Sequence, residues 1–356
     1  MSNTKQIGIL TLHRALNYGA VWQCYALMKA CESMGHVVST IDYNPYGHYE
    51  AKWAIGRRPS TAYRYLMFLR QFNKFVASRL NPTIHSESHE WMMQNPPKKD
   101  IYIVGSDTVW SNAIVGDYLD SYLLDFAPST IKRISYAAST GGNPLKVNDK
   151  QQAELHKFSA ISIREKQSVG DVQALVDIPV VDVCDPTLLL TKDDYAALEE
   201  RPIWLPKHYV VYFDLAGDPF CAASAKEVSK QLNVPILNLA GKYKSWTRYN
   251  YMAPTPEQWL YILHHADYVC TNSFHGVCFS IIYRRPFVYC EAKVQGHNKR
   301  TGRIRNLLEQ IHLEDVYVTD IECVAKNLTG GGEYNENLIS QYRERSLEWL
   351  KNAIES

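Results

Sequence analysis

The stretch Ile7–Ile41, IGILTLHRALNYGAVWQCYALMKACESMGHVVSTI, decides the fold class of this chain. It opens with the apolar run Ile7–Leu12, which is typical of a short buried strand. Residues 17–19 break this run, and Ala20–Met34 then predicts a helix with Val21, Tyr25, Met28 and Cys31 on one face. Val37–Ile41 predicts a second strand. The order strand, helix, strand indicates a parallel sheet covered by helices.

The same alternation continues along the rest of the chain. Further strands are expected at residues 101–104, 133–138, 160–164, 180–183, 209–213, 235–239, 268–271 and 286–289. With 356 residues the chain exceeds the usual size of one domain. We therefore expect an α/β fold with two Rossmann-like domains over residues 1–195 and 208–330, joined by a proline-containing linker at 201–207, and a C-terminal helix over 335–356. Ligands bind at the carboxyl ends of parallel strands, so one site in the cleft between the domains is predicted.

Residues 50–95 interrupt the alternation with a run of aromatic and basic side chains at helical spacing, among them Trp53, Arg57, Arg58, Tyr63, Arg64 and Phe68. This pattern predicts a helical insertion in the first domain. One interpretation is a solvated basic face over an aromatic core. The other is peripheral contact with an anionic lipid or a lipid-linked substrate.

Composition narrows the class of protein. The net charge is +1, from 38 basic and 37 acidic residues, which argues against a general nucleic-acid-binding role. No window reaches the roughly 18 apolar residues of a membrane span, and the N-terminal apolar run is too short for a signal peptide. The sequence thus predicts a cytoplasmic protein, which would reach any membrane-linked substrate from the inner face of the membrane.

The eight cysteines contain no Cys-x-x-Cys pair, and several lie in apolar runs. Zinc sites need a closer ligand spacing than these cysteines offer. We interpret the cysteines as buried free thiols of a protein in a reducing compartment.

Polar side chains follow several of the expected strands. Residues 17–19 could present backbone N–H groups to an anion, or could form an ordinary strand-to-helix turn. Asp107 could activate a hydroxyl or cap a helix. Arg164, close to the end of an apolar strand, requires a carboxylate or phosphate partner, which either a ligand or a structural salt bridge could supply. His275 lies between an apolar strand and an apolar helix, where a general acid or base would face a ligand.

Six stretches carry a resemblance when they are read in order: Asn17–Leu27, Val104–Trp110, Ser135–Ser139, Ile163–Glu165 with Ser168, Asp185–Leu189 and Ser273–Gly276. Together they resemble the polysaccharide pyruvyl transferase family over roughly residues 7–310. The resemblance implies two domains arranged as in GT-B glycosyltransferases. It also implies transfer of a pyruvyl group from phosphoenolpyruvate to a pair of sugar hydroxyls as a cyclic ketal, in the synthesis of bacterial surface or capsular polysaccharide.

The resemblance implies roles for Arg164 and His275, and the chemistry of the implied reaction suggests roles for other residues. The first domain would be the acceptor side, with Asn17, Tyr18 and Gly19 contacting the sugar, either free or linked to a lipid. The second would be the donor side. His275 and, more weakly, Asp107 are the expected catalytic residues, and the donor-binding residues are expected to be Arg164, Ser139, Ser273, Lys299 and Arg303. Nothing resembles a carboxylate-rich magnesium site, so no metal or further cofactor is expected.

One position departs from the family pattern. Some members carry Arg-x-His where this chain has Ser273-Phe274-His275. A cation must then come from elsewhere, and Lys299 and Arg303 are candidates, although a solvated helix start explains them equally well. Two other functions stay open: a GT-B glycosyltransferase that uses a nucleotide sugar, and a non-catalytic member that binds a glycan.

Overall fold

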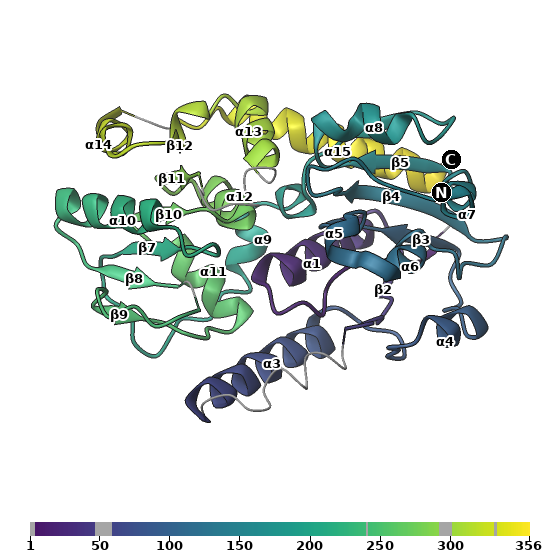
Figure 1. Ribbon diagram of the computed structural model, residues 1–356, viewed down its shortest axis with the longest axis horizontal. Helices are drawn as coiled ribbons and strands as arrows, with labels where there is room; N and C mark the ends of the chain where they lie inside the picture. The colour runs from purple at the N-terminus through teal and green to yellow at the C-terminus, as the bar shows by residue number, and fades with distance from the viewer. Residues whose placement is uncertain (1–3, 47–58, 240, 292–300, 331–332) are drawn as a thin grey trace. The chain divides into compact units, whose positions relative to one another are not determined.

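The computed structural model (Figure 1) describes residues 4–46, 59–239, 241–291, 301–330 and 333–356. The chain divides into two compact units. Unit 1 comprises Met1–Leu189 and Gln341–Ser356, and unit 2 comprises Leu190–Ser340. Each unit contains its own parallel sheet of six strands, so the predicted α/β fold with two Rossmann-like domains is confirmed.

Unit 1 has the strand order β2-β1-β3-β4-β5-β6, and every pair is parallel. The strands are β1 (Gln6–Leu10), β2 (Val37–Thr40), β3 (Ile101–Val104), β4 (Lys132–Ala138), β5 (Ala160–Ile163) and β6 (Val180–Asp182). The helices are α1 (Tyr18–Ser33), α3 (Pro59–Arg79), α4 (His89–Gln94), α5 (Asn112–Val115), α6 (Leu119–Tyr122), α7 (Asp149–Leu155) and α8 (Val169–Gln173). Apolar side chains of β1 and β3 are fully buried because helices cover the sheet.

Helix α3 is the main element of the predicted helical insertion, and α4 follows it. Its aromatic side chains pack on α1: the rings of Tyr18 and Phe68 are 5.5 Å apart, and those of Trp22 and Phe75 are 4.8 Å apart. Both pairs meet edge to face, an arrangement that adds to the energy of burial. This aromatic seam fixes α3 to α1, and the two helices are labelled in Figure 1.

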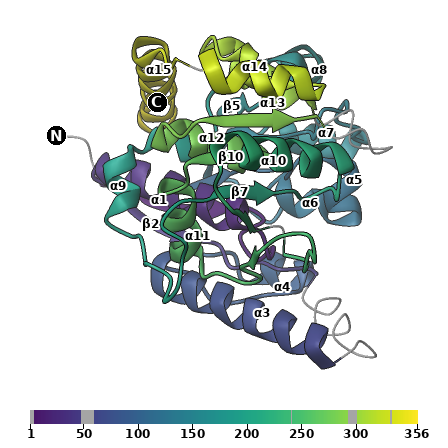
Figure 2. The same cartoon turned by 90° about the vertical axis from the view of Figure 1, so that its left-hand side faces the viewer.

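Unit 2 has the strand order β12-β11-β10-β7-β8-β9, again parallel throughout. Its strands are β7 (Val210–Phe213), β8 (Ile236–Asn238), β9 (Tyr249–Asn250), β10 (Tyr268–Thr271), β11 (Phe287–Cys290) and β12 (Tyr317–Val318). Its helices are α9 (Lys192–Ala196), α10 (Pro219–Leu232), α11 (Pro256–His264), α12 (Phe274–Tyr283), α13 (Thr301–Gln310) and α14 (Ile321–Gly330). Helix α10 lies across β7 and β10 and buries Cys221, Ala225 and Val228 against them (Figure 2).

The division between the units falls at Leu189, before the segment 201–207 that we interpreted as a linker, so α9 and that segment belong to unit 2. The predicted C-terminal helix is α15 (Glu336–Glu355). From Gln341 onward it belongs to unit 1, where Ser346 Oγ accepts a hydrogen bond of 3.0 Å from the Cys184 backbone N–H. The last helix is thus part of the first unit's core.

The cysteines are free, and all except Cys323 are buried. Burial raises the pKa of the Cys24 and Cys184 thiols to about 12, which keeps them protonated and unreactive at neutral pH. Among the residues that the structure describes, no helix is both long enough and apolar enough to cross a bilayer.

Candidate functional site

The carboxyl ends of three neighbouring strands in unit 1 bring Asp107, Ser139 and Arg164 together. These residues follow or end β3, β4 and β5, which pair side by side. The Ser139 backbone N–H donates to the Asp107 carbonyl at 2.9 Å, and the Arg164 N–H donates to the Ala138 carbonyl at 3.1 Å. Three of the predicted site residues therefore share one edge of the sheet.

The guanidinium of Arg164 is held in a buried cluster of charges. Its Nη1 donates to Asp185 Oδ2 at 2.8 Å, and its Nε lies 3.7 Å from Glu165 Oε1. Burial alone would lower the pKa of Arg164, but the charges of Asp185, Glu165 and Asp107 outweigh it and raise this pKa. This geometry matches the structural salt bridge that the sequence left open, and it keeps a permanent cation beside three carboxylates.

Hydroxyl and amide side chains extend this cluster toward the first strand. The Ser106 backbone N–H donates to Gln23 Oε1 at 2.9 Å, and Gln23 Nε2 donates to Thr11 Oγ1 at 2.8 Å. Ser139 Oγ donates a short hydrogen bond to Glu165. Gln23, Glu165 and Asp185 are therefore members that the sequence analysis did not assign. All three lie within the motifs quoted above. Their polar side chains inside those motifs were the feature of the sequence that could have identified them.

The three residues predicted to contact the acceptor form the start of α1. Asn17 is its N-cap, with Oδ1 accepting from the Gly19 N–H at 2.9 Å. Tyr18 is 6% exposed and packs against Phe68 and Phe72. The ordinary strand-to-helix turn thus accounts for the structure of this segment.

A pocket of about 430 Å³ opens beside that turn within unit 1. Its wall is largely aromatic and apolar, formed by Tyr43, Tyr46, Tyr65, Tyr122, Leu12, Ala15, Leu16 and Ile114 together with Arg14 and Asn44. The hydroxyl of Tyr46 donates to the Ile114 carbonyl at 3.0 Å, and the hydroxyl of Tyr43 accepts from Ser121 at 3.0 Å. Because these hydroxyls bond within the protein, the two rings contribute mainly apolar surface, which suits the C–H face of a sugar or an apolar aglycone.

One carboxylate next to this pocket lies close to an arginine and two histidines. Asp42, only 2% exposed, lies 3.1 Å from His13 Nε2, 2.5 Å from Arg14 Nη2 and 3.2 Å from His85 Nδ1. Burial raises the pKa of Asp42, but hydrogen bonds from His13 and Arg14 and their charges outweigh it, so this pKa lies below the ordinary value. Asp42 therefore stays ionised and fixes Arg14 at the pocket wall.

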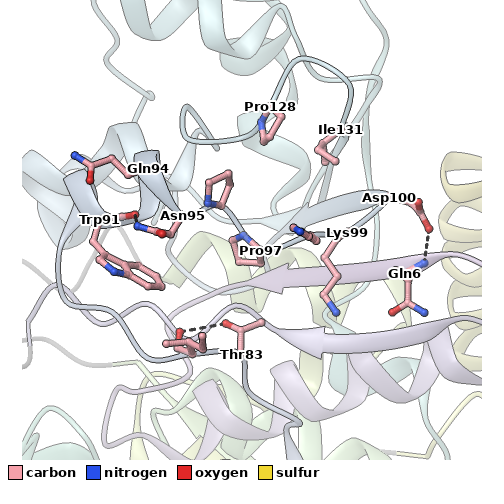
Figure 3. Close-up of a pocket in the computed structure, with 13 residues that line it drawn as sticks. Gln6, Thr83, Trp91, Gln94, Asn95, Pro97, Lys99, Asp100, Pro128 and Ile131 are labelled. Atoms are coloured by element: carbon pink, nitrogen blue, oxygen red, sulfur yellow. Dashed lines mark hydrogen bonds between the residues drawn. The ribbon is translucent and has the colours of Figure 1, made fainter.

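A larger pocket of about 950 Å³ lies at the amino ends of the strands of the same sheet (Figure 3). Its lining includes Gln6 at the start of β1 and Asp100 and Ile131, which precede β3 and β4. It also carries Trp91 and Lys99. Ligands of open parallel sheets bind at the carboxyl ends of strands, so the position of this pocket, rather than its size, separates it from the candidate site.

In unit 2, the junction between β10 and α12 positions Ser273 and His275. Ser273 is the N-cap of α12, and its Oγ accepts from the Gly276 N–H at 3.3 Å. A serine at this position therefore has a structural reason that an arginine could not satisfy. His275 follows in the first turn, 7% exposed, with its ring edge-on to Phe274 at 5.3 Å.

The structure describes one of the two candidate cations, Arg303, and not the other, Lys299. Arg303, on α13, places its guanidinium 5.9 Å from the ring of Phe274 and thus close to the start of α12. Lys299 lies outside the described residues. Arg303 as a replacement for the arginine that the family pattern has at Ser273 stays a prediction.

A comparison with known protein families identifies the family of this chain. The model of the family "polysaccharide pyruvyl transferase" matches residues 17–292. This chain belongs to the polysaccharide pyruvyl transferase family. The match spans Asn17, Asp107, Arg164 and His275, whereas Lys299 and Arg303 lie beyond it. No curated protein matches the chain significantly.

Solved structures similar to this family member show its fold. Arabidopsis thaliana UGT89C1 complexed with UDP-L-rhamnose has 11% identity and a TM-score of 0.52, with 99% of this chain and 98% of that chain covered. UDP-GlcNAc 2-epimerase from Methanocaldococcus jannaschii has 12% identity and a TM-score of 0.50, with coverages of 98% and 99%. Both likenesses extend over the whole chain and concern the fold alone.

A further group in unit 2 combines ligand types that metals use. Glu199, His264 and His265 place one potential ligand atom each within 4.8 Å of one another. Glu199 Oε1 lies 2.7 Å from His264 Nδ1, and His265 Nδ1 bonds to the Tyr261 carbonyl at 2.9 Å. An ion pair and a helix-end hydrogen bond explain these contacts, so we assign the group no part in the reaction.

Proposed function

We propose that this chain transfers the pyruvyl group of phosphoenolpyruvate to two hydroxyls of a sugar, forming a cyclic ketal in bacterial surface or capsular polysaccharide. Membership of the polysaccharide pyruvyl transferase family supports this reaction. The observation that carries it is the position of His275, on the first turn of α12 directly after the carboxyl end of β10. There the imidazole lies in the first turn of a helix, and helix N-termini favour anions in general.

The start of α12 suits a donor that carries a carboxylate and a phosphate. The first N–H groups of a helix have no partner within the helix and attract anions. Ser273 caps the N–H of Gly276, and the Arg303 guanidinium lies near Phe274. We assign one anionic group of the donor to this helix start and Arg303, with Ser273 supplying a hydroxyl.

The methylene carbon of phosphoenolpyruvate must be protonated before the neighbouring carbon forms a bond to a sugar oxygen. In our proposal His275 gives its proton to the methylene carbon of phosphoenolpyruvate, and a sugar hydroxyl attacks the neighbouring carbon, releasing its own proton to a base. The C–O bond to phosphate then breaks, and the second hydroxyl attacks the same carbon and loses its proton. One phosphate leaves, and the ketal retains both sugar oxygens.

Unit 1 supplies the remaining roles in this proposal. Asp107 is partly exposed at the edge of the sheet and would accept a proton from an attacking hydroxyl. Arg164 would direct hydrogen bonds to the donor, with Asp185 fixing the guanidinium. The tyrosine-lined pocket would hold the acceptor, which binds through its apolar faces. In this proposal, variants of either set of residues should impair the same reaction.

The proposed activity is tested by incubating the protein with phosphoenolpyruvate and a panel of free, nucleotide-linked and lipid-linked sugars. Phosphate release coupled to a mass gain of one pyruvyl group less water supports the proposal. Release of a nucleotide from a nucleotide sugar instead would support a glycosyltransferase. Glycan binding with neither release would support a non-catalytic member.

The role of His275 has its own test. His275→Gln should lower kcat by about 10²- to 10⁴-fold, because a positioned general acid contributes on that scale. Binding of phosphoenolpyruvate should persist, since the charge recognition lies elsewhere. His208→Gln is the matched control, because His208 is an exposed histidine of the same unit that pairs with Asp267. Near-normal turnover of His275→Gln at saturating donor would reduce His275 to a binding residue.

A further inference from the structure

Helix α3 carries an exposed face with two large apolar side chains followed along the helix by two basic ones. Tyr63 is 68% exposed and Leu66 is 55% exposed, and Arg70 and Lys74 are exposed as well. Their spacing of three, four and four residues places these four side chains on one side of the helix. We call them the α3 face. The opposite side of α3 is the aromatic seam against α1, so the α3 face points away from the core.

The charge around this face is of one sign. The sequence contains no aspartate or glutamate between Glu50 and Glu87, whereas that interval holds the basic residues Lys52, Arg57, Arg58, Arg64, Arg70, Lys74 and Arg79. The whole chain has a net charge of only +1, so the local excess is specific to the insertion. Within the described part of the chain, neither Arg70 nor Lys74 forms an ion pair. Exposed cations without carboxylate partners are what an anionic surface attracts.

The combination of exposed apolar and exposed basic side chains favours a bilayer over other anionic partners. A soluble polyanion would use the cations and leave Tyr63 and Leu66 in water. A bilayer offers both an anionic headgroup layer and an apolar layer directly beneath it. Tyrosine is also a residue that prefers the boundary between these layers.

We propose that the α3 face docks this protein on a membrane surface rich in anionic phospholipid, with Tyr63 and Leu66 entering the headgroup region and Arg70 and Lys74 contacting phosphates. This surface goes beyond the proposed reaction and does not depend on it. It has a consequence for the acceptor, because Tyr65 of the same helix lines the tyrosine pocket of unit 1. A docked α3 brings that pocket to the bilayer, where a lipid-linked acceptor would be reached.

The test is flotation of the full chain with vesicles of phosphatidylcholine, alone or mixed equally with phosphatidylglycerol, at about 0.15 M salt. We expect binding to the mixed vesicles and little to phosphatidylcholine alone. Each basic residue near an anionic surface contributes about fivefold to partitioning, so Arg70→Glu/Lys74→Glu should weaken binding by at least about 25-fold. Tyr63→Ser/Leu66→Ser should weaken it by at least about tenfold.

Two control variants change the same properties elsewhere. Lys230→Glu/Lys351→Glu alters the net charge equally, at exposed positions on α10 and α15. Ile203→Ser/Tyr243→Ser removes two side chains of unit 2 that are 101% and 69% exposed. Both should keep binding within about threefold of the wild type. At this ionic strength, the charges on the docking surface matter more than the net charge of the protein. Circular dichroism would show that all variants are folded.

Three results would overturn the proposal. The first is failure of the wild type to float with the mixed vesicles. The second is binding of the α3 variants that is no weaker than that of the two controls. The third is full binding by Tyr63→Ser/Leu66→Ser together with loss of binding by the charge variant, which would identify a site for soluble polyanions. None of these readouts requires pyruvyl transfer, so the docking surface and the proposed reaction fail independently.

Discussion

Gly276 offers the sharpest test of how the β10–α12 junction is built. A Cβ atom added at this position would lie 2.6 Å from Thr271 Oγ1 and 3.1 Å from Phe213 Cδ1. The Thr271 hydroxyl cannot simply turn away, because it donates to the Phe213 carbonyl at 2.7 Å and accepts from the Ser273 N–H at 3.0 Å. Gly276→Ala must therefore displace the first turn of α12 or break these hydrogen bonds.

The expected cost follows from competing contributions. Alanine in place of glycine favours a helix by up to about 1 kcal/mol. Forcing an extra methyl group into a packed site costs about 1–3 kcal/mol, and each hydrogen bond that is lost costs about 0.5–1.5 kcal/mol more. We expect Gly276→Ala to lower the free energy of unfolding by about 1–3 kcal/mol overall. Gly170→Ala is the matched control, because nothing lies within 4 Å of its added Cβ and α8 should gain stability.

Thermal unfolding and steady-state kinetics measure the two consequences. One kcal/mol shifts Tm by about 2–4 °C in a domain of this size, so Gly276→Ala should lower the Tm of unit 2 by roughly 2–12 °C. Turnover should fall by about tenfold, since His275 immediately precedes Gly276 and a 1 Å misplacement can cost about 100-fold.

A double-mutant cycle identifies the cause. Thr271→Ala removes Oγ1, the atom closest to the new methyl group, and leaves Phe213 Cδ1 in place. Gly276→Ala should therefore cost at least about 1 kcal/mol less in that background than in the wild type. Strictly additive effects, or a Gly276→Ala protein as stable as Gly170→Ala, would refute the steric account of this junction.

Two further predictions concern the charges of unit 1. Arg164→Lys keeps the charge but loses the guanidinium fork, so the KM for phosphoenolpyruvate should rise at least about tenfold with kcat less affected; an unchanged KM with a lowered Tm would leave Arg164 only its salt bridge. Asp42→Asn should lower the free energy of unfolding by about 3 kcal/mol at pH 7, because His13 and Arg14 lose their buried partner. The pKa of Asp42 is lowered in the folded state, so its stabilisation is complete above pH about 4 and declines below it. Urea unfolding at pH 7 and pH 3 should therefore show a deficit that shrinks in acid; a constant deficit would contradict this assignment.

Much of the fold was predictable because its signals are local. The expected strand at residues 268–271 coincides with β10, and the apolar helix expected next to His275 is α12, since each is an apolar run bounded by polar residues. The two-residue strands β9 and β12 were not predicted. So short a strand carries no periodicity, and its place depends on pairing with β8 or β11.

The candidate site was predictable in its positions but not in its pairings. Sequence motifs identified Arg164 at a strand end, yet its partner Asp185 lies 21 residues further on in another strand's loop. Likewise Asp42 meets Arg14 and His85 from separate segments. Such contacts depend on the order of strands in the sheet, which periodicity does not specify. The N-cap role of Ser273 was recognisable in principle, since a serine preceding an apolar helix is a common cap.

The two sets of candidate residues differ in their charge, and in the proposed reaction this difference would give them different parts in donor binding. Around Arg164 lie Asp185, Glu165 and Asp107, so that edge of unit 1 attracts no anion through its net charge. The start of α12 combines a helix terminus with Arg303 and is the more favourable place for phosphate. If Arg164 contacts the donor, it must therefore contribute directed hydrogen bonds rather than overall attraction. Lysine preserves attraction and loses direction, which is why the KM of Arg164→Lys separates a ligand-binding arginine from a purely structural one.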